Sequence, residues 1–440
     1  MCRVDIDQTM STATPQLRLA AQQSPGRRKG PLRIGLLGHG LIGSAVAALT
    51  GSRPDALDRP IVLTSALVRS TSGRAERAAV PLTTDPEDVF RTNPDVLVEV
   101  LGGLEPARTL VLESIDRGIP VVTANKSLLA HHGDELLDAA ESSGVRLCYE
   151  ASVIAGVPFL CTLARRPLAS SITSFTGIVN GTTNYILSEI ENAGVAYAMA
   201  LADAQRRGFA EPDPSKDVDG SDALEKLVVL VRQLSSCSVS PAAIEARGIQ
   251  SIGARDLVHA RELGGTIKPV AHAEWSGNDV HAFAGPAFVS ASDPLAGLAG
   301  ASNGICLRDR HGSELFFSGP GAGPLPTAVT IVDDVLEAVG EGTARPLARR
   351  RGTVGAPSTG WLIRLSSDRL LPRGEEVADL LSACGVWVVR TSSRDTRDGG
   401  EAVWLLTYAC MREQAEAAAR TIAAAARCDV QLVRALGARS

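Results

Sequence analysis

The sequence has no excess of charge of either sign and no cysteine motif. Its 440 residues include 44 basic and 49 acidic side chains, which give a net charge of −5. A chain without a strong positive charge lacks the electrostatic footprint of a nucleic-acid-binding protein. The eight cysteines are scattered without any Cys-x-x-Cys pair, which argues against a zinc site and against a disulfide framework. Free thiols of this kind are typical of a reducing, cytoplasmic compartment.

Long apolar runs are also missing. No apolar stretch reaches the roughly 18 to 20 residues that a membrane-spanning helix requires, so we expect no membrane partner. The start of the chain lacks the apolar segment of a secretory signal, and residues 1–31 are expected to form a disordered tail. A hydrophobic content of 45% nevertheless suffices for a sizeable core. The length predicts two to four domains of about 150 residues each.

A glycine turn follows the strand-like residues 32–37 and precedes a helix that starts near residue 44. Gly38 permits a tight turn, Gly40 lets the backbone approach a pyrophosphate, and Gly43 lets the helix pack on the strand. The strand before and the helix after favour a dinucleotide site over a glycine-rich turn without a ligand. The expected cofactor-binding residues are Gly38, Gly40, Leu41, Ile42 and Gly43.

Strand-like runs alternate with helical segments up to residue 150, which predicts a parallel, Rossmann-type sheet. The second run, residues 61–68, ends at Arg69, where an NAD-selective site would place an acid for the ribose hydroxyls. An arginine suits a 2′-phosphate, so NADP is the favoured cofactor, with NAD left open. The run at residues 120–123 places Lys126 beside the expected cofactor crevice, although a solvated loop lysine is an equal alternative.

Residues 208–226 combine a rigid acidic loop with the start of a helix. Two proline-containing acidic dipeptides at 211–214 are expected to hold the backbone extended. Asp222 is placed to cap a helix and shares a face with Lys226 four residues later. The apolar run that follows indicates a buried helix, which favours a lysine that faces a cleft over a surface ion pair. A calcium loop is excluded, because Lys226 occupies the position that needs a bidentate glutamate.

Two further blocks follow the nucleotide-binding segment. Residues 180–185, with Gly181 and Thr182, form a polar turn into a helix, which either holds an anionic ligand group or is a capped turn. Strand-like runs at 283–289 and 314–317 indicate a mixed sheet. From residue 361 onwards the order is βαββαβ, the ferredoxin-like arrangement. We therefore predict an α/β Rossmann-type parallel-sheet domain, an α+β catalytic domain with a mixed sheet, and a C-terminal ferredoxin-like (ACT-like) βαββαβ domain.

Five motifs in register resemble the homoserine dehydrogenase family, over about residues 32–336. They are Gly38-His39-Gly40-Leu41-Ile42-Gly43, Val98-Glu99-Val100-Leu101-Gly102-Gly103, Thr123-Ala124-Asn125-Lys126, the run from Asn180 to Leu187, and the run from Glu211 to Lys226. The resemblance implies reversible, NAD(P)-dependent interconversion of L-aspartate 4-semialdehyde and L-homoserine. It also implies domain boundaries of 32–157 for the NAD(P)-binding domain, completed by 324–345, 158–323 for the catalytic and dimerisation domain, 346–358 for a linker and 359–440 for the ACT-like regulatory domain.

The resemblance assigns roles to individual residues. Lys226 and Lys126 match the catalytic lysines, and Gly321 matches a glycine that touches the cofactor. The residues that would bind the small-molecule substrate are Glu211, Asp217, Asp222, Gly181 and Thr182. In such enzymes a hinge segment can bind a sodium ion through main-chain oxygens, and the matching residues are Glu150, Val153, Ala155 and Val157. A homodimer or homotetramer is expected.

The tail departs from the family pattern. The turn after the first strand of an ACT domain normally reads Asp-x-Pro-Gly-Val-Leu, whereas residues 366–374 here read differently. This difference argues against threonine feedback, so the C-terminal domain is expected either to bind another ligand or only to dimerise, with threonine left open as the effector. Two rival functions stay open, a dehydrogenase for a related amino-acid aldehyde in secondary metabolism and a non-catalytic nucleotide or amino-acid sensor. The cofactor preference, the oligomer, the effector and the metabolic role are not fixed by the sequence.

Overall fold

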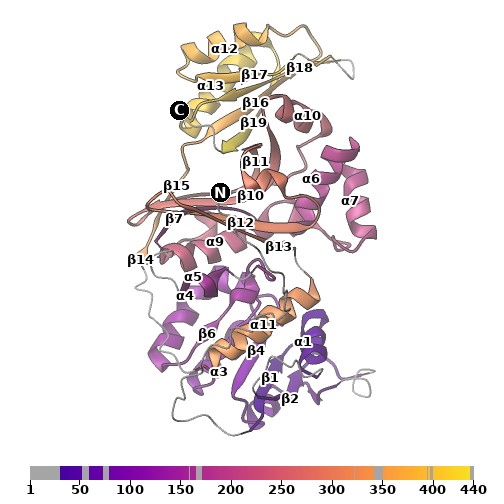
Figure 1. The fold of residues 1–440 in the computed structure, drawn as a ribbon, viewed down its shortest axis with the longest axis vertical. Helices are drawn as coiled ribbons and strands as arrows, with labels where there is room; N and C mark the ends of the chain where they lie inside the picture. The colour runs from indigo at the N-terminus through magenta and orange to yellow at the C-terminus, as the bar shows by residue number, and fades with distance from the viewer. Residues whose placement is uncertain are drawn as a thin grey trace, which may run out of the picture.

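Three blocks follow one another along the longest axis of the molecule, a computed structural model (Figure 1). The structure describes residues 30–51, 59–72, 79–157, 159–164, 171–321, 323–340, 350–393, 395–396 and 400–436. The N-terminal block lies at the indigo end of Figure 1, the mixed sheet in the middle and the C-terminal block at the yellow end. The expected disordered tail lies outside the described residues, except for Gly30 and Pro31.

The N-terminal block is built on a parallel sheet with the strand order β3-β2-β1-β4-β5-β6. Its strands are β1 (Leu32–Leu37), β2 (Ile61–Leu67), β3 (Leu82–Thr83), β4 (Val96–Glu99), β5 (Val121–Thr123) and β6 (Leu147–Cys148). The connecting helices are α1 (Leu41–Gly51), α2 (Pro86–Arg91), α3 (Ala107–Asp116) and α4 (Lys126–Ser143). Because the strands are parallel, the loops after β1, β2, β4 and β5 meet at one edge of the sheet, where such sheets bind ligands.

A helix from much later in the chain closes this block. Helix α11 (Pro324–Ala338) packs against α1 and against the short 3-10 helix η2 (Glu150–Ser152). Its buried residues Ala328, Ile331 and Val335 join the same apolar cluster as β1 and β4. The chain therefore leaves the N-terminal block after residue 150 and returns to it after the central sheet.

The central block is a mixed sheet flanked by helices. Its strands, in the order β13-β12-β7-β10-β11, are β13 (Glu314–Pro320), β12 (Ser302–Asp309), β7 (Ile172–Ile178), β10 (Gly265–Ser276) and β11 (Asp279–Ser290). The helices are α5 (Leu160–Ala164), α6 (Gly181–Ala193), α7 (Tyr197–Arg206), α8 (Ser215–Val218), α9 (Ser221–Ser235) and α10 (Ala254–Glu262). Helix α9 packs on β10 and β11 and also on α4, so it joins the central sheet to the N-terminal block (Figure 1).

The C-terminal block confirms the expected βαββαβ order. Its elements are β16 (Gly360–Ser367), α12 (Gly374–Ala383), β17 (Val388–Thr391), β18 (Glu401–Thr407), α13 (Arg412–Ala426) and β19 (Asp429–Leu436). The strand order is β19-β16-β18-β17, with all three pairs antiparallel. One face of this sheet packs against α12 and α13, and the other against α10. Strand β19 also pairs with β11, so the central and C-terminal sheets are continuous.

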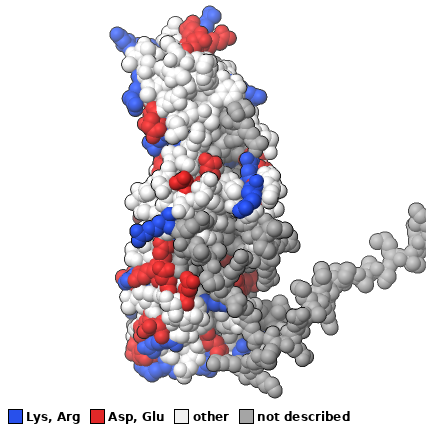
Figure 2. Space-filling model, turned by 90° about the vertical axis from the view of Figure 1, so that its left-hand side faces the viewer, with Lys and Arg blue, Asp and Glu red and all other residues white. Residues whose placement is uncertain are grey.

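The segment expected to be a linker contains two short strands. Strand β14 (Arg350–Arg351) pairs with β8 (Cys237–Ser238), and β15 (Thr353–Gly355) pairs with β11. The chain thus stays hydrogen-bonded to the central block on its way to the C-terminal block. No helix among the described residues is long and apolar enough to cross a membrane. Acidic and basic side chains are interspersed on the face shown in Figure 2.

Candidate active site

Two helices that start at the junction of the N-terminal and central blocks each supply a lysine. Helix α4 begins at Lys126, directly after β5, because the side chain of Asn125 accepts a hydrogen bond from the Leu128 N–H at 3.1 Å. Helix α9 carries Lys226 in its second turn. The two helices are held together by Arg232 of α9, whose Nε lies 2.8 Å from Asp134 Oδ1 of α4. The packing of these helices therefore brings the two expected catalytic lysines to one place.

One carboxylate lies between the two lysines. The Lys226 Nζ is 2.8 Å from Asp222 Oδ2, and the Lys126 Nζ is 3.2 Å from Asp222 Oδ1. Lys226 also donates a hydrogen bond to the Val179 carbonyl at 2.7 Å. The side chain of Lys226 is only 11% exposed, whereas that of Lys126 is 34% exposed. The site therefore holds two ammonium groups on one buried acid, and Lys126 is the more accessible of them.

The electrostatics follow from burial and from this pairing. Burial by itself would raise the pKa of Asp222, but the charges of Lys226 and Lys126 lower it to about 2. Burial would likewise lower the pKa of Lys126, yet the charge of Asp222 raises it above its usual value. The nearby Asp217 has a raised pKa, chiefly because it is buried and because Asp222 is close. Near neutral pH, Asp222 is thus ionised and Lys126 is protonated.

Asn180 begins the polar turn that the sequence predicted at residues 180–185, but it was not among the expected site residues. Its Nδ2 donates to Asp217 Oδ1 at 2.7 Å and to Asp222 Oδ2 at 2.8 Å. Its Oδ1 accepts the Thr183 N–H at 2.9 Å and so caps α6. The buried side chain of Asn180 therefore positions both Asp217 and Asp222 and also caps α6. The available signal was a polar N-cap residue between strand β7 and helix α6.

The expected capping role of Asp222 is wrong. The N-cap of α9 is Gly220, which has a φ of 91°, and Asp222 lies within the first turn as a buried residue. The Ser221 N–H is bound instead by Asp219 Oδ1 at 2.8 Å. Glu225, in the same turn of α9, accepts a hydrogen bond from the Ser127 hydroxyl at 2.7 Å. The carboxylate of Asp222 is thereby free to bind lysines.

The remaining substrate-site predictions lie at the start of α6 and in the loop before α8. Gly181 starts α6 and is buried, and a side chain there would lie 2.7 Å from the Ala301 carbonyl. Thr182 is partly exposed, and its hydroxyl donates to the Phe209 carbonyl at 2.5 Å. Glu211 is exposed, and its carbonyl accepts from Gln205 at 3.2 Å. The acidic loop is not extended throughout, because Pro214 has a ψ of 9° and leads into α8.

Gly321 lies where the central block returns to the N-terminal block. A side chain at Gly321 would lie 1.9 Å from the Ala301 carbonyl and 3.4 Å from the Gly181 Cα. The position therefore requires glycine for packing against the start of α6. Gly321 thus lies next to Gly181, one of the residues expected to bind the substrate.

The glycine turn has the geometry that a dinucleotide needs. Gly38 has a φ of 108°, and a side chain there would lie 2.8 Å from the Val100 carbonyl. A side chain at Gly43 would lie 2.3 Å from the Gly38 carbonyl, whereas one at Gly40 would meet open space. Leu41, the first residue of α1, is 79% exposed. The turn is thus tight on its inner side and leaves room at Gly40 for a phosphate at the helix N-terminus.

Two charged residues flank this turn at the same edge of the sheet. Arg69 follows β2 and is exposed. Glu99 ends β4 and is fully buried, and it accepts hydrogen bonds from the Thr123 hydroxyl at 2.5 Å and from the Leu101 N–H at 2.8 Å. Burial raises the pKa of Glu99. Through these contacts, Glu99 fixes the end of β5 and thereby the start of the helix that carries Lys126.

The segment expected to bind sodium is a buried turn. Val153 is extended, with φ −132° and ψ 126°, and Ile154 and Gly156 have φ values of 46° and 88°. Helix α11 holds this segment, because Asp334 Oδ2 accepts the Ala151 N–H at 3.1 Å and Thr330 accepts the Gly156 N–H at 3.2 Å. No cluster of three acidic, histidine or cysteine side chains that could hold a metal ion occurs among the described residues.

A dinucleotide fold whose carboxyl edge meets a second block at a pair of ammonium groups has the layout of a nicotinamide-dependent oxidoreductase. The family profile described as homoserine dehydrogenase matches residues 158–336, and the one described as the homoserine dehydrogenase NAD-binding domain matches residues 38–150. The chain belongs to the homoserine dehydrogenase family, so the resemblance drawn from the five motifs is confirmed.

Relatives and solved structures agree with this assignment. A homoserine dehydrogenase of Corynebacterium glutamicum is 34% identical over 414 residues, which are 88% of this chain and 92% of the relative. One of Synechocystis sp. is 38% identical over 321 residues, 70% of this chain and 73% of the relative. The crystal structure of a homoserine dehydrogenase from Thiobacillus denitrificans superposes with a TM-score of 0.82 at 29% identity, and covers 92% of this chain and 98% of its own.

Proposed function

We propose that this protein reduces L-aspartate 4-semialdehyde to L-homoserine with NADPH, reversibly, in the biosynthesis of threonine, methionine and isoleucine. The observation that carries the proposal is the Lys126–Asp222–Lys226 array at the edge where the glycine turn lies. When bound, the nicotinamide supplies the hydride that reduces the aldehyde carbon. The residues of the chain have to bind the substrate, stabilise the charge that develops on its oxygen and deliver a proton.

The two lysines interact with the carbonyl oxygen of the substrate. Negative charge builds on this oxygen during reduction, and preorganised ammonium groups stabilise it. Lys226 is held by Asp222 and by the Val179 carbonyl. Its ammonium group therefore needs little reorganisation to stabilise the oxygen and to donate a proton to it. Lys126, raised in pKa and more exposed, supplies a second positive charge from the cofactor side.

The acids of the site bind the amino-acid end of the substrate. The substrate carries an ammonium group, and a carboxylate is its natural partner. Glu211 is exposed on the loop before α8, and Asp217 is held by Asn180 beside the lysines. These two acids, with the start of α6 at Gly181 and Thr182, would orient the amino acid so that its aldehyde faces Lys226.

NADP is the proposed cofactor over NAD. Arg69 is exposed after the end of β2. It lies at the same edge of the sheet as the glycine turn, which has open space at Gly40. A guanidinium suits a 2′-phosphate, whereas ribose hydroxyls need an acid there. A hyperthermophilic archaeal homoserine dehydrogenase in complex with NADPH, at 26% identity and a TM-score of 0.59, supports the same choice. Arg69→Glu should raise the KM for NADPH at least about tenfold and leave that for NADH nearly unchanged.

A sodium ion is proposed at residues 150–157, bound by the main-chain oxygens of Glu150, Val153, Ala155 and Val157. Ile154 and Gly156 in this buried turn have positive φ values, and an irregular backbone of this kind is compatible with main-chain oxygens that point to a common centre. The buried Asp334, whose pKa lies well above its usual value because of burial, braces the turn. Replacing sodium by tetramethylammonium should lower the melting temperature, whereas an unchanged value would rule the ion out.

The remaining proposals concern assembly, location and regulation. We propose a homodimer or homotetramer built through the central block, a cytoplasmic location in line with the free cysteines of the described residues, and an amino-acid effector at the C-terminal block. The ferredoxin-like strand order supports the last of these. Sedimentation, cell fractionation and ligand binding would test them in turn.

Steady-state kinetics test the proposed reaction. Wild-type protein should oxidise NADPH when L-aspartate 4-semialdehyde is added, and Lys226→Met should abolish this activity. Lys216→Met is the matched control, because Lys216 lies on the neighbouring helix α8 and is exposed. Turnover of related amino-acid aldehydes but not of aspartate semialdehyde would refute the substrate, and equal activity of both variants would refute the role of Lys226.

A further inference from the structure

The central block contains a buried lysine that lies outside the candidate active site. Lys268 belongs to β10 and is only 2% exposed. Its Nζ donates a hydrogen bond to the Leu298 carbonyl at 2.8 Å, and Glu191 Oε2 lies 3.9 Å away. Burial lowers the pKa of Lys268, and the charge of Glu191 opposes this shift. Because a buried ammonium group is costly, a lysine at this position requires an explanation beyond packing.

The carbonyl that Lys268 binds belongs to residues 298–302, the segment that leads into β12. Fully buried Asn184 of α6 binds the same segment. Its Nδ2 donates to three carbonyl oxygens, at 3.4 Å from Leu298, 3.0 Å from Gly300 and 3.2 Å from Ser302. The Ser188 hydroxyl, one turn later in α6, accepts the Gly300 N–H at 3.1 Å. Side chains of a strand and a helix thus hold the backbone of one short segment.

These contacts are part of a row of polar side chains along α6. The row occupies positions i, i+4, i+8 and i+11, which share one face of a helix, and consists of Asn180, Asn184, Ser188 and Glu191. Asn180, at one end, binds the two acids of the candidate active site. Glu191, at the other end, faces Lys268. The row therefore fixes the rotation of α6 about its axis from the candidate active site to Lys268.

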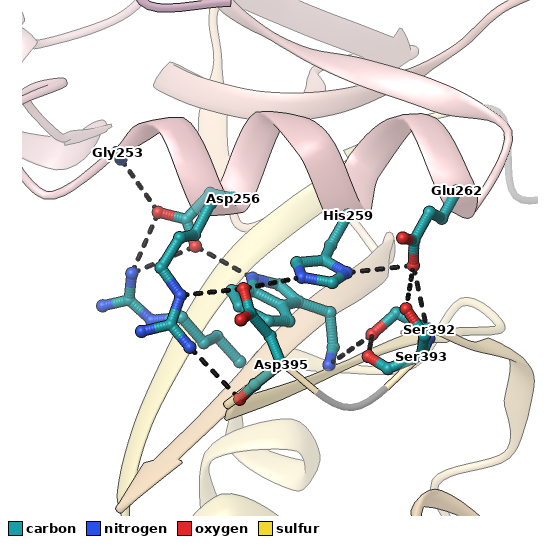
Figure 3. A network of polar contacts seen from close by, with 10 residues as sticks. Gly253, Asp256, His259, Glu262, Ser392, Ser393 and Asp395 are labelled. Atoms are coloured by element: carbon teal, nitrogen blue, oxygen red, sulfur yellow. Dashed lines mark hydrogen bonds and ion pairs between the residues drawn. The ribbon is translucent and has the colours of Figure 1, made fainter. Parts of the chain in front are cut away.

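Glu191 has further partners, so it does not depend on Lys268. Its Oε1 accepts hydrogen bonds from the Thr266 hydroxyl at 2.8 Å and from Arg261 Nε of α10 at 3.1 Å. Helix α10 is held in turn by the network of Figure 3, in which three of its residues bind the C-terminal block, namely Asp256, His259 and Glu262. Glu191 therefore stays paired when Lys268 is replaced by an apolar residue.

The segment 298–302 also contacts the two glycines expected at the substrate and at the cofactor. The Ala301 carbonyl would lie 2.7 Å from a side chain at Gly181 and 1.9 Å from one at Gly321. Gly181 is the first residue of α6, and Gly321 is the glycine that the family resemblance assigns to the cofactor. A shift of the segment would therefore change the spacing between these two glycines.

We propose that Lys268 is a positioning residue for the reaction, an inference that rests on the proposed function. Together with Asn184, Lys268 holds residues 298–302 so that the Ala301 carbonyl sets the spacing of Gly181 and Gly321. An ammonium group suits this role, because a charge-assisted hydrogen bond is stronger than a neutral one. Catalysis depends on such positioning, since a displacement of about 1 Å can slow a reaction about 100-fold.

Hydrogen exchange followed by mass spectrometry tests the hold without any turnover. Lys268→Met keeps a side chain of similar length but removes the donor to the Leu298 carbonyl. Peptides that cover residues 298–302 should exchange at least about tenfold faster in this variant, and peptides of the N-terminal block should exchange as in the wild type. The melting temperature should stay near that of the wild type, because Glu191 keeps its other partners. Unchanged exchange of residues 298–302 overturns the proposal.

Single-turnover hydride transfer from NADPH to L-aspartate 4-semialdehyde tests the consequence for the reaction. The rate constant should fall at least about tenfold in Lys268→Met. Ile267→Val, at the neighbouring buried position of β10, is the matched control and should keep the wild-type rate constant. A merely structural role of Lys268 would lower the amplitude, because fewer molecules would be folded, and would leave the rate constant unchanged. That result overturns the proposal.

Ser188→Ala keeps the test decisive where Lys268→Met fails to fold. This variant removes the hydroxyl that accepts the Gly300 N–H, so hydride transfer should slow at least about twofold and residues 298–302 should exchange faster. Wild-type values in both measurements overturn the proposal. Absence of hydride transfer to the semialdehyde in the wild type would instead refute the proposed function, and the exchange experiment would still decide whether Lys268 holds the segment.

Discussion

Replacing Asp222 by asparagine should destabilise the protein and disable the site in one step. Asp222 is buried between Lys126 and Lys226, with Nζ–O distances of 3.2 and 2.8 Å. Asparagine keeps the shape of the side chain but leaves both ammonium groups without their shared counter-charge. Loss of one partner from a buried ion pair typically costs about 3–5 kcal/mol, because the remaining charge stays buried.

The pKa of Asp222 gives an independent magnitude and a pH dependence. Its pKa falls from 3.8 to about 2 on folding. At about 1.4 kcal/mol for each pKa unit, this corresponds to about 2 kcal/mol of stability. Because the folded pKa is the lower one, the contribution is fully present above pH 3.8 and is lost as the pH falls towards 2. The variant should therefore lose about 2–5 kcal/mol at pH 7, and the difference should shrink as the pH falls below 3.8 towards 2.

Urea unfolding followed by tryptophan fluorescence at pH 7, 5 and 3 measures this difference. Asp219→Asn is the matched control, because Asp219 is an exposed neighbour whose Oδ1 binds the Ser221 N–H, a contact that asparagine can also make. The control should unfold like the wild type. Equal unfolding free energies for Asp222→Asn and the wild type at pH 7 would refute the argument, as would a difference that persists unchanged at the lowest pH.

Three further changes test other parts of the site. Gly40→Val fills the open space beside the glycine turn, so cofactor affinity measured by fluorescence titration should fall at least about tenfold while the unfolding midpoint hardly changes. Asn180→Ala leaves Asp217 and Asp222 without their shared donor, so kcat should fall about tenfold or more and α6 should lose its cap, at a cost of about 1 kcal/mol. Glu99→Gln should keep the fold, since the amide oxygen can still accept the Leu101 N–H. Because burial raises the pKa of Glu99 towards the neutral form, which an amide resembles, activity at pH 7 should stay near that of the wild type.

Much of the N-terminal block could be predicted because its signals are local. The turn from Gly38 to Gly43 combines a strand, three glycines and a helix within a few residues. The strand-like run at residues 120–123 likewise placed Lys126 beside the expected crevice, but its catalytic role came only from the family resemblance. The helix that starts at Lys126 was not predicted, although Asn125, whose side chain caps it, is a favoured N-cap residue.

Long-range packing explains most of what was missed. Strand β10 has seven successive buried residues at its start, because it lies in the middle of the sheet with both faces covered, and this removes the alternation by which strands are recognised. Gly220 rather than Asp222 caps α9 because the Arg247 carbonyl packs against it from elsewhere in the chain. The role of Asn180 depends on two acids that lie 37 and 42 residues later.

Hydride transfer in a single turnover tests the central claim most directly. Enzyme saturated with NADPH is mixed with L-aspartate 4-semialdehyde, and the loss of cofactor absorbance is followed in the wild type, Lys226→Met and Lys216→Met. Loss of one group that stabilises a developing oxyanion slows such reactions about 10²- to 10³-fold, so Lys226→Met should bind NADPH normally but transfer hydride at least 100-fold more slowly. Transfer at the wild-type rate in Lys226→Met, or an equal loss in Lys216→Met, would contradict the account.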